Sequence, residues 1–342
     1  MTYWWLIPVL AGLSFALTAL LRGYALSRSL MDIPNQRSSH SVPTPRGGGV
    51  AIVVTFLAAV VVLFCTGLMA PAASIALLGA GGITALIGFL DDHGHVAARW
   101  RLLAHFFAAA WGVFWIGGLP PLAIFGVTLQ MGWLGHLLAV IYLVWMLNLY
   151  NFMDGIDGIA GVEAVTICLG GGLLYWVIGM PELVWPPVLL AVCAAGFLCW
   201  NFPPAKIFMG DAGSGFLGII LGVLSLQAAW IDPALLWAWL ILLGVFIVDA
   251  TFTLLRRLIR GDRIYEAHRS HAYQFASRHF GKHLPVTSAV AVINVLWLLP
   301  IAVCVVYFKM DGAGALTLAY VPLILLAVKF RAGQLEGSSS HK

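Results

Sequence analysis

Long apolar runs separated by short polar connections make up most of the chain. A membrane-spanning helix needs about 20 predominantly apolar residues, so these runs predict eleven helices. They cover residues 3–21, 49–68, 71–90, 102–119, 134–150, 159–179, 184–200, 213–230, 234–255, 286–307 and 313–330. The stretch 120–133 begins with two prolines and is a candidate for re-entering the membrane. The pattern predicts an all-α polytopic membrane protein, with a single integral-membrane domain over 1–331 and a flexible tail or cloning remnant over 332–342.

Composition narrows the class of protein further. The 342 residues are 61% hydrophobic and 9% charged, whereas soluble domains carry about 25% charged residues. This excludes an ordinary soluble enzyme and a disordered protein. The net charge of +4 is too small to build a nucleic-acid-binding surface, so no nucleic-acid partner is expected. Because the apolar runs are continuous rather than alternating, a membrane β-barrel is excluded as well.

The basic residues predict an orientation. When successive connections are placed on alternate sides of a membrane, all of the 18 Lys and Arg except Lys309 lie on one side. Cytoplasmic connections of membrane proteins carry such an excess of Lys and Arg. We therefore expect the N-terminus outside, the C-terminus in the cytoplasm, and the protein in the bacterial inner membrane.

Acidic residues gather at the predicted cytoplasmic helix ends, where apolar residues flank them. They are Asp91, Asp92, Asp154, Asp157, Glu163, Asp211 and Asp249. Carboxylates at a membrane boundary are costly unless they are paired, solvated or metal-bound. Their common location favours a single polar site on the cytoplasmic face.

The densest polar stretch is 148–158. Asn148, Asn151, Asp154 and Asp157 recur every three residues, which would place them on one stripe of a helix or 3₁₀ turn. Such a stripe offers oxygen ligands to a hard cation and amide donors to a nucleotide. The structural alternative is a polar helix–turn–helix junction.

Two further carboxylate positions are informative. Asp91 and Asp92 end a predicted helix, where the helix dipole disfavours negative charge, so a metal or the nearby Arg99 and Arg101 should compensate. Asp211 precedes another helix, which it could simply N-cap. That helix N-terminus is also a ready anion site, at which Asp211 could hold Mg²⁺ against a phosphate.

The last large cytoplasmic loop, 256–285, is rich in basic residues and histidines. Topology explains part of this charge, and His268-Arg269-Ser270-His271 offers no third ligand for a zinc site. Clustered His and Arg beside acidic loops favour the binding of phosphate oxygens.

Taken in order, these motifs resemble the polyprenyl-phosphate N-acetylhexosamine-1-phosphate transferases. This superfamily includes the MraY translocases of peptidoglycan synthesis and the WecA-type enzymes that start O-antigen chains. The resemblance rests on PTPRGGG, the Asp91-Asp92 pair, NxxNFMDGIDG, NFPPAKIFMGDAGS and HRSH, which together span 43–271. The last motif departs from the three consecutive histidines of the MraY branch and is closer to the O-antigen-initiating WecA and WbpL kind.

The resemblance implies a reaction and a set of roles. A lipid phosphate, undecaprenyl phosphate, would attack the sugar-bearing phosphorus of a UDP-N-acetylhexosamine, with Mg²⁺ (or Mn²⁺) as cofactor, and release UMP. By resemblance, Asp211 and Asn151 would ligate the metal, Asp91 and Asp92 would lie beside the acceptor phosphate with Asp91 as candidate base, and Asp154 and Asp157 would shape the nucleotide pocket. The other substrate-binding residues would be Asn148, Asn201, Lys206, Phe208, Arg46 and Arg269. His268 and His271 would hold the diphosphate. Membrane lipid is the other expected partner, and a homodimer is left open.

Two other classes of function compete with this interpretation. A CDP-alcohol phosphotransferase would share the DGIDG-like carboxylates, but Ala160 is followed by Gly161 and no further Asp appears before Asp211. A cation-coupled transporter would use intramembrane carboxylates near mid-membrane, usually within internal repeats. The sequence shows no repeat, and its carboxylates lie at one face.

Overall fold

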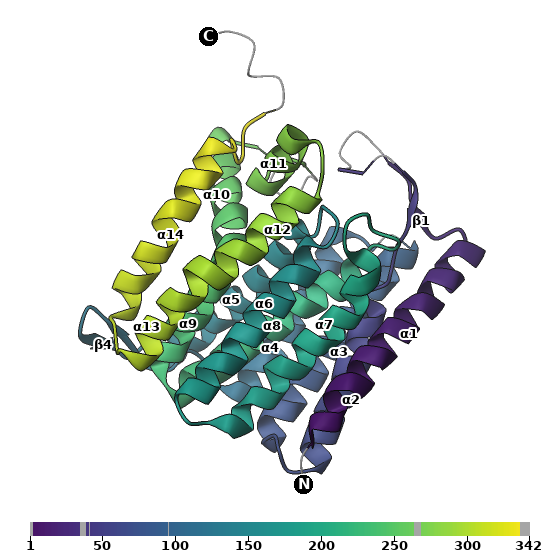
Figure 1. Ribbon diagram of the computed structural model, residues 1–342. Helices are drawn as coiled ribbons and strands as arrows, with labels where there is room; N and C mark the ends of the chain where they lie inside the picture. Colours follow the sequence, from purple (N-terminus) through teal and green to yellow (C-terminus); the bar gives the residue numbers. More distant parts are fainter. Residues whose placement is uncertain (1–2, 35–38, 41, 95, 263–267, 336–342) are drawn as a thin grey trace, which may run out of the picture.

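The computed structural model describes residues 3–34, 39–40, 42–94, 96–262 and 268–335, which form one bundle of helices (Figure 1). The helices are α1 Leu6–Ser27, α2 Val50–Cys65, α3 Pro71–Gly94, α4 Ala98–Ile116, α5 Gly132–Met153, α6 Ile159–Val177, α7 Trp185–Asn201, α8 Asp211–Ile231, α9 Pro233–Leu242, α10 Gly244–Arg260, α11 Ala272–Phe280, α12 Leu284–Ile293, α13 Leu299–Tyr307 and α14 Gly312–Lys329. A π-helical turn, Asn294–Leu298, joins α12 to α13. Two short antiparallel pairs complete the fold: β1 Met31–Asp32 with β2 Thr44–Pro45, and β3 Leu122–Ile124 with β4 Val127–Leu129.

Every predicted apolar run is helical, which confirms an all-α polytopic membrane protein. Within the described residues, eight helices are long and apolar enough to cross a membrane, and counting α9 and α10 as one broken span gives nine. The helix α2 is apolar but shorter. The count of eleven spans therefore stays a prediction.

One detail of the expected fold is corrected. The run 234–255 is not one straight helix, because α9 and α10 meet at an angle of 72°. The stretch 120–133 holds the β3–β4 hairpin, and its re-entry into the membrane stays a prediction. At the start of the expected tail, Ala332 is buried and the N–H of Gly333 donates to the carbonyl of Ser270, while 336–342 lie outside the described residues. The flexible tail therefore stays a prediction as well.

The central helix is α8, which packs against α3 and α5. Of its membrane-span window, 83% is buried inside the protein. Two glycines allow the close approach: a Cβ at Gly88 of α3 would lie 2.6 Å from the backbone N of Ala212, and one at Gly218 would lie 2.5 Å from the carbonyl O of Met146. The glycines thus bring the polar ends of α3 and α5 against the start of α8.

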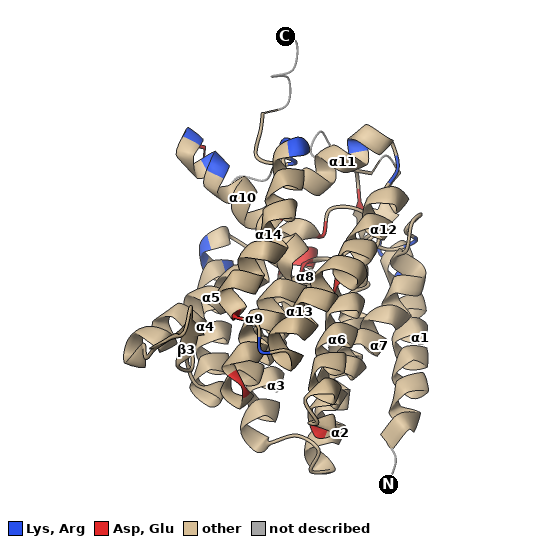
Figure 2. Ribbon diagram, turned by 60° about the vertical axis from the view of Figure 1, so that its left-hand side comes forward, with Lys and Arg blue, Asp and Glu red and all other residues tan. Residues whose placement is uncertain are grey.

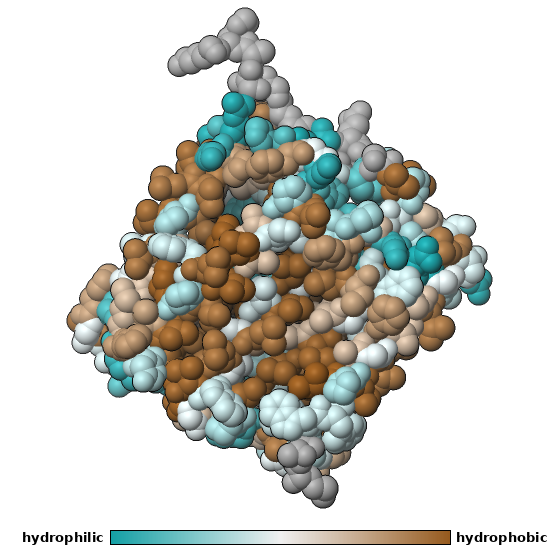
Figure 3. All heavy atoms as spheres, in the orientation of Figure 1, coloured by the Kyte–Doolittle hydropathy of each residue, from teal (hydrophilic) through white to brown (hydrophobic). Residues whose placement is uncertain are grey.

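The two ends of the bundle differ in charge. The N- and C-termini lie at opposite ends, and Lys and Arg gather at the end that carries α10 and α11 (Figure 2). Between the ends runs a broad apolar surface (Figure 3). Exposed apolar side chains of the described residues include Phe114, Leu296 and Leu325. This distribution is typical of a bundle embedded in lipid. Which end faces the cytoplasm stays a prediction.

Candidate active site

Two neighbouring cavities open where α3, α5 and α8 meet the loops at the basic end. The first has a volume of about 390 Å³, and its lining is the more apolar of the two, with Ile87, Leu102, Leu147 and Phe152. We call it the apolar cavity. The second, of about 410 Å³, is lined mainly by polar residues of several loops; we call it the polar cavity. Asn151, Asp211 and His268 line both cavities. The two spaces therefore meet at a single carboxylate, Asp211.

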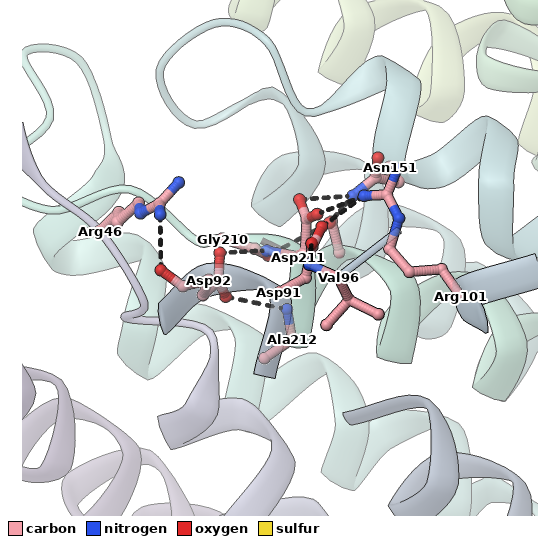
Figure 4. Close-up of polar contacts among 10 residues, drawn as sticks. Arg46, Asp91, Asp92, Val96, Arg101, Asn151, Gly210, Asp211 and Ala212 are labelled. Carbon is pink, nitrogen blue, oxygen red and sulfur yellow. Dashed lines mark hydrogen bonds and ion pairs between the residues drawn. The ribbon is translucent and has the colours of Figure 1, made fainter. Parts of the chain in front are cut away.

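Asp211 is surrounded by polar groups from three helices (Figure 4). Its Oδ1 accepts a hydrogen bond of 2.9 Å from the side-chain amide of Asn151, which also donates to the hydroxyl of Ser214 at 2.9 Å. Its Oδ2 lies 3.4 Å from Nη1 of Arg101. These contacts orient the carboxylate between the cavities.

Asp91 forms an ion pair with Arg101. Its Oδ2 accepts from Nη1 of Arg101, and its Oδ1 accepts from the backbone N–H of Val96 at 2.8 Å. Arg101 lines the apolar cavity, whereas Asp91 lines neither cavity. Of the two expected cations, Arg101 is the partner of Asp91, and the same Nη1 atom also contacts Asp211.

Asp92 caps the central helix. Its two carboxylate oxygens accept from the backbone N–H groups of Asp211 and Ala212, each at 3.2 Å, and the Arg46 guanidinium donates to its backbone carbonyl at 2.5 Å. Two expectations are corrected here. Asp211 is not the N-cap of α8, because Gly210 holds that position with a φ of +80°. The open N–H groups of α8 are not a vacant anion site, because Asp92 already occupies two of them.

The four polar residues of 148–158 do not share one stripe, which corrects a further expectation. The helix α5 ends at Met153, so Asn148 and Asn151 are helical while Asp154 and Asp157 lie in the turn that follows. Asn148 lines the apolar cavity and donates locally to the carbonyl of Val144 at 2.7 Å. Asp154 and Asp157 line the polar cavity. The turn therefore divides the motif between the two cavities.

Asp154 is a partly buried carboxyl group among other carboxylates. No hydrogen bond to its side chain is formed within the described residues. Burial, followed by the negative charges of Asp211, Asp92 and Asp157, raises its pKa to about 7. The excess of negative charge at this position would be relieved by a bound cation.

Asp157 pairs with a histidine that the motif analysis did not select. Its Oδ1 lies 3.1 Å from Nδ1 of His283, and its Oδ2 accepts from the N–H of Ala205 at 3.0 Å. Nε2 of His283 lies 3.0 Å from the carbonyl O of Ser39, so both ring nitrogens face oxygen acceptors. Burial is the largest single influence and opposes charge on both partners. The Asp157–His283 hydrogen bond, the attraction between the two charges and the backbone contacts to Ala205 and Ser39 together outweigh it, lowering the pKa of Asp157 and raising that of His283.

This ion pair predicts a pH-dependent stability. The contribution of Asp157 is lost as pH falls through its lowered folded-state pKa, and that of His283 is lost as pH rises through its raised one. We expect His283→Gln to lower the melting temperature by a few degrees between the ordinary pKa values of 3.8 and 6.5, and by less at alkaline pH. Thermal unfolding in detergent at several pH values measures this, with His279→Gln at an exposed position as control. A pH-independent difference would contradict the pairing.

The 200–214 loop supplies one wall of the polar cavity. Phe208 and His40 meet there with ring centroids 4.8 Å apart, and both line the cavity. Asn201 lines it too, but its amide is already committed to the backbone, accepting from Gly158 N–H and donating to Ile207 C=O. Lys206 lines neither cavity, because its ammonium lies over the Trp200 ring.

The His268–His271 segment contributes to the lining of both cavities. The two rings stack with centroids 4.9 Å apart, and Nδ1 of His271 lies 3.3 Å from Oδ1 of Asp249. Burial, and then the positive charges of His271 and Arg257, lower the pKa of His268 to about 3. His271 lines the apolar cavity and His268 lines both, whereas Arg269 lines neither. The contact between His271 and Asp249 was not predicted from the sequence, because no motif joins these two residues.

The donor set suits Mg²⁺ better than a softer metal. No group of three or more His, Cys, Asp or Glu with metal-binding geometry exists among the described residues. Mg²⁺ is commonly held by one or two carboxylates, with water and substrate phosphates completing its shell. The carboxylate oxygens of Asp211 and the charge excess around Asp154 fit that requirement. Asn151 presents its side-chain nitrogen, not its oxygen, to Asp211 in this structure.

The fold and the site place two cavities of different polarity at one carboxylate of a membrane-type helical bundle. A model of the family described as glycosyl transferase family 4 matches residues 73–229. The chain is 30% identical over 271 residues to an undecaprenyl-phosphate α-N-acetylglucosaminyl 1-phosphate transferase of Thermotoga maritima, covering 79% of this chain and 80% of that protein. It is 28% identical over 265 residues to a probable undecaprenyl-phosphate N-acetylglucosaminyl 1-phosphate transferase of Bacillus subtilis (75% and 72% covered). It is 32% identical over 237 residues to a phospho-N-acetylmuramoyl-pentapeptide-transferase of Streptococcus thermophilus (64% and 67% covered).

The chain therefore belongs to the polyprenyl-phosphate N-acetylhexosamine-1-phosphate transferase superfamily, as its motifs indicated. This membership removes the grounds for the transporter and the CDP-alcohol phosphotransferase alternatives. The matches reach both the N-acetylglucosaminyl and the muramoyl-pentapeptide relatives, so they do not by themselves select the sugar.

Proposed function

We propose that this protein transfers an N-acetylhexosamine 1-phosphate from a UDP-sugar to undecaprenyl phosphate at the cytoplasmic face of the inner membrane, and so initiates O-antigen or a related envelope polysaccharide. The observation that carries the proposal is the position of Asp211 at the junction of the two cavities. A polyprenyl phosphate and a nucleotide sugar differ in polarity in the same way as the two cavities do. Their phosphates would meet at the carboxylate that both cavities share.

The polar cavity suits the nucleotide sugar. Phe208 presents an aromatic ring on which a uracil can stack, and Asp154 and Asp157 offer acceptors to ribose or sugar hydroxyls. Arg46 lines the same cavity and places positive charge beside it. His268 is kept neutral by its lowered pKa, so it would act on the diphosphate as a hydrogen-bond donor rather than as a cation.

The apolar cavity suits the lipid acceptor. Its apolar wall can take the first isoprenyl units, while Arg101 lies at the end near Asp211. A guanidinium is the side chain best shaped to hold a phosphate. Asp91 keeps Arg101 in place, which gives it a positioning role on the acceptor side.

In the reaction, an oxygen of the lipid phosphate forms a bond to the sugar-bearing phosphorus, and the bond from that phosphorus to the bridging oxygen of UMP breaks. UMP leaves with the electron pair. Mg²⁺ held by Asp211 and Asn151 would screen the negative charge of both reactants. Arg101 would align the attacking phosphate, and Asn151 would orient Asp211; such positioning and electrostatics account for most catalysis of phosphoryl transfer. The acceptor phosphate is largely ionised at neutral pH, so little is left for Asp91 to do as a base.

Substrate choice tests the proposal directly. We expect the purified enzyme, incubated with Mg²⁺ and undecaprenyl phosphate, to release UMP from a UDP-N-acetylhexosamine. UDP-N-acetylglucosamine, UDP-N-acetylfucosamine, UDP-N-acetylquinovosamine and UDP-N-acetylmuramoyl-pentapeptide are compared, with UDP-glucose as control. The short His268–His271 loop favours the three UDP-N-acetylhexosamines over the muramoyl-pentapeptide substrate. Turnover of the pentapeptide alone would move the enzyme to the peptidoglycan branch, and no release of UMP from any of them would reject the reaction.

A further inference from the structure

The turn that follows α5 is held from two sides. On one side lies the loop before α8, where Oδ2 of Asp157 accepts from the N–H of Ala205 and the N–H of Gly158 donates to the side-chain oxygen of Asn201. On the other side lies the first turn of α12, where the hydroxyl of the fully buried Thr287 donates to the backbone carbonyl of Asp157 at 2.8 Å. Both the main chain and the side chain of Asp157 are therefore fixed by distant parts of the chain.

His283, the residue just before α12, completes the second side. It precedes Thr287 by four residues, so the two side chains lie on one face of the helix start. Nδ1 of His283 lies 3.1 Å from Oδ1 of Asp157. Nε2 lies 3.0 Å from the carbonyl oxygen of Ser39, to which it must donate, because a carbonyl oxygen only accepts. Both ring nitrogens are thus committed to protein oxygens.

The contact with Ser39 extends to the aromatic wall of the polar cavity. The next residue is His40, whose ring meets the Phe208 ring with centroids 4.8 Å apart. Ser39, His40, Phe208, Asp157 and His283 all line the polar cavity. Because Ser39 and His283 are 244 positions apart, their contact joins walls of the cavity that the local chain does not connect.

We propose that His283 is a positioning residue for the sugar-nucleotide donor. It joins the turn that carries Asp157 to the segment that carries His40, and so sets the spacing between the Asp157 carboxylate and the Phe208 ring. This inference rests on the proposed function, because it takes the polar cavity as the donor site. Since both ring nitrogens bind protein oxygens, His283 acts through these neighbours rather than on the substrate itself.

Two substitutions separate the two contacts of the ring. The side-chain amide nitrogen of Asn lies about where Nδ1 lies, and that of Gln about where Nε2 lies. His283→Asn can therefore keep the contact with Asp157, and His283→Gln the contact with Ser39. We expect each to raise the KM for the UDP-sugar that the wild type uses about fivefold, the scale of one net hydrogen bond, while the KM for undecaprenyl phosphate stays unchanged. His279→Gln, at an exposed position that lines neither cavity, should change neither KM.

Thr287→Val tests the same support without altering the imidazole, and it carries the test if neither His283 variant folds. It removes the hydroxyl that donates to Asp157 and should raise the KM for the UDP-sugar in the same direction. Thr18→Val is the matched control, because it removes an equally buried hydroxyl that donates to the carbonyl of Ser14 within α1. A purely structural role of His283 and Thr287 would lower the melting temperature and the active fraction but not change the KM of the active enzyme.

The outcomes separate this proposal from the proposed function. An unchanged donor KM in His283→Asn, His283→Gln and Thr287→Val, with Asp157→Asn still impaired, would overturn the proposal alone. An equal rise in the KM for both substrates would overturn it too, because it would indicate a general distortion of the site. An unchanged donor KM in Asp157→Asn as well would overturn the assignment of the polar cavity to the donor, and with it this proposal.

Discussion

Asp211→Asn is expected to fold and to lose nearly all turnover. The carboxylate lies where the two cavities meet, and a neutral amide is a poor ligand for a hard cation. Without the bound cation, the negative charge that the reaction concentrates on the phosphates would lack its main counter-charge. Loss of such electrostatic stabilisation typically costs a factor of about 10²–10³ in rate. The hydrogen bond from Asn151 can be kept by the Asn oxygen, so the fold of the site should survive.

The measurement is UMP release with and without EDTA, together with a Mg²⁺ titration of each variant. Asp311→Asn is the matched control, because it makes the same chemical change beside the start of α14 at the far end of the bundle, where Asp311 accepts from the N–H of Gly314. Its turnover and Mg²⁺ dependence should equal those of the wild type. Turnover that resists EDTA, or an active Asp211→Asn enzyme, would show that the metal assignment is wrong.

How far the fold could be predicted depends on which information is local. The length of each apolar run is a local property, so the helices follow from the sequence. The break at Leu243 does not, because the apolar run continues through it. Beside the break, the hydroxyl of Tyr320, distant in the chain, donates to the carbonyl of Leu240. A continuous hydrophobic pattern therefore predicts a helix but not its straightness.

The same distinction separates the parts of the site that could and could not be predicted. The motifs identify Asp211, Asn151 and Phe208, whose side chains the structure places at the cavities. The role of Asp92 as a helix cap depends on the close approach of α3 to α8 at Gly88, which no single motif contains. The pairing of Asp157 with His283 joins residues 126 positions apart. Lys206 belongs to a motif and still lies outside the cavities, because its ammonium lies over the Trp200 ring.

Arg101→Gln is expected to impair the acceptor side selectively. Arg101 lines the apolar cavity and bridges Asp91 and Asp211, so its removal takes the guanidinium away from the attacking phosphate. A hydrogen bond to a charged group contributes about 1.5–3 kcal/mol, which corresponds to a loss of about 10- to 150-fold in kcat/KM for undecaprenyl phosphate. UDP-sugar binding in the absence of lipid should stay within a few-fold of the wild type, because Arg101 does not line the polar cavity.

Asp157→Asn is the converse variant, and it should weaken UDP-sugar binding by at least about 1 kcal/mol through the polar cavity, where it removes a charged acceptor and the partner of His283. Calorimetry of UDP-sugar binding without lipid, combined with kcat/KM at varied undecaprenyl phosphate, separates the two effects. Arg99→Gln provides the matched control, since Arg99 lies over the Trp100 ring on the same helix and lines neither cavity. Equal losses of UDP-sugar binding in Arg101→Gln and Asp157→Asn would mean that the cavities do not divide the two substrates, and that donor and acceptor share one space around Asp211.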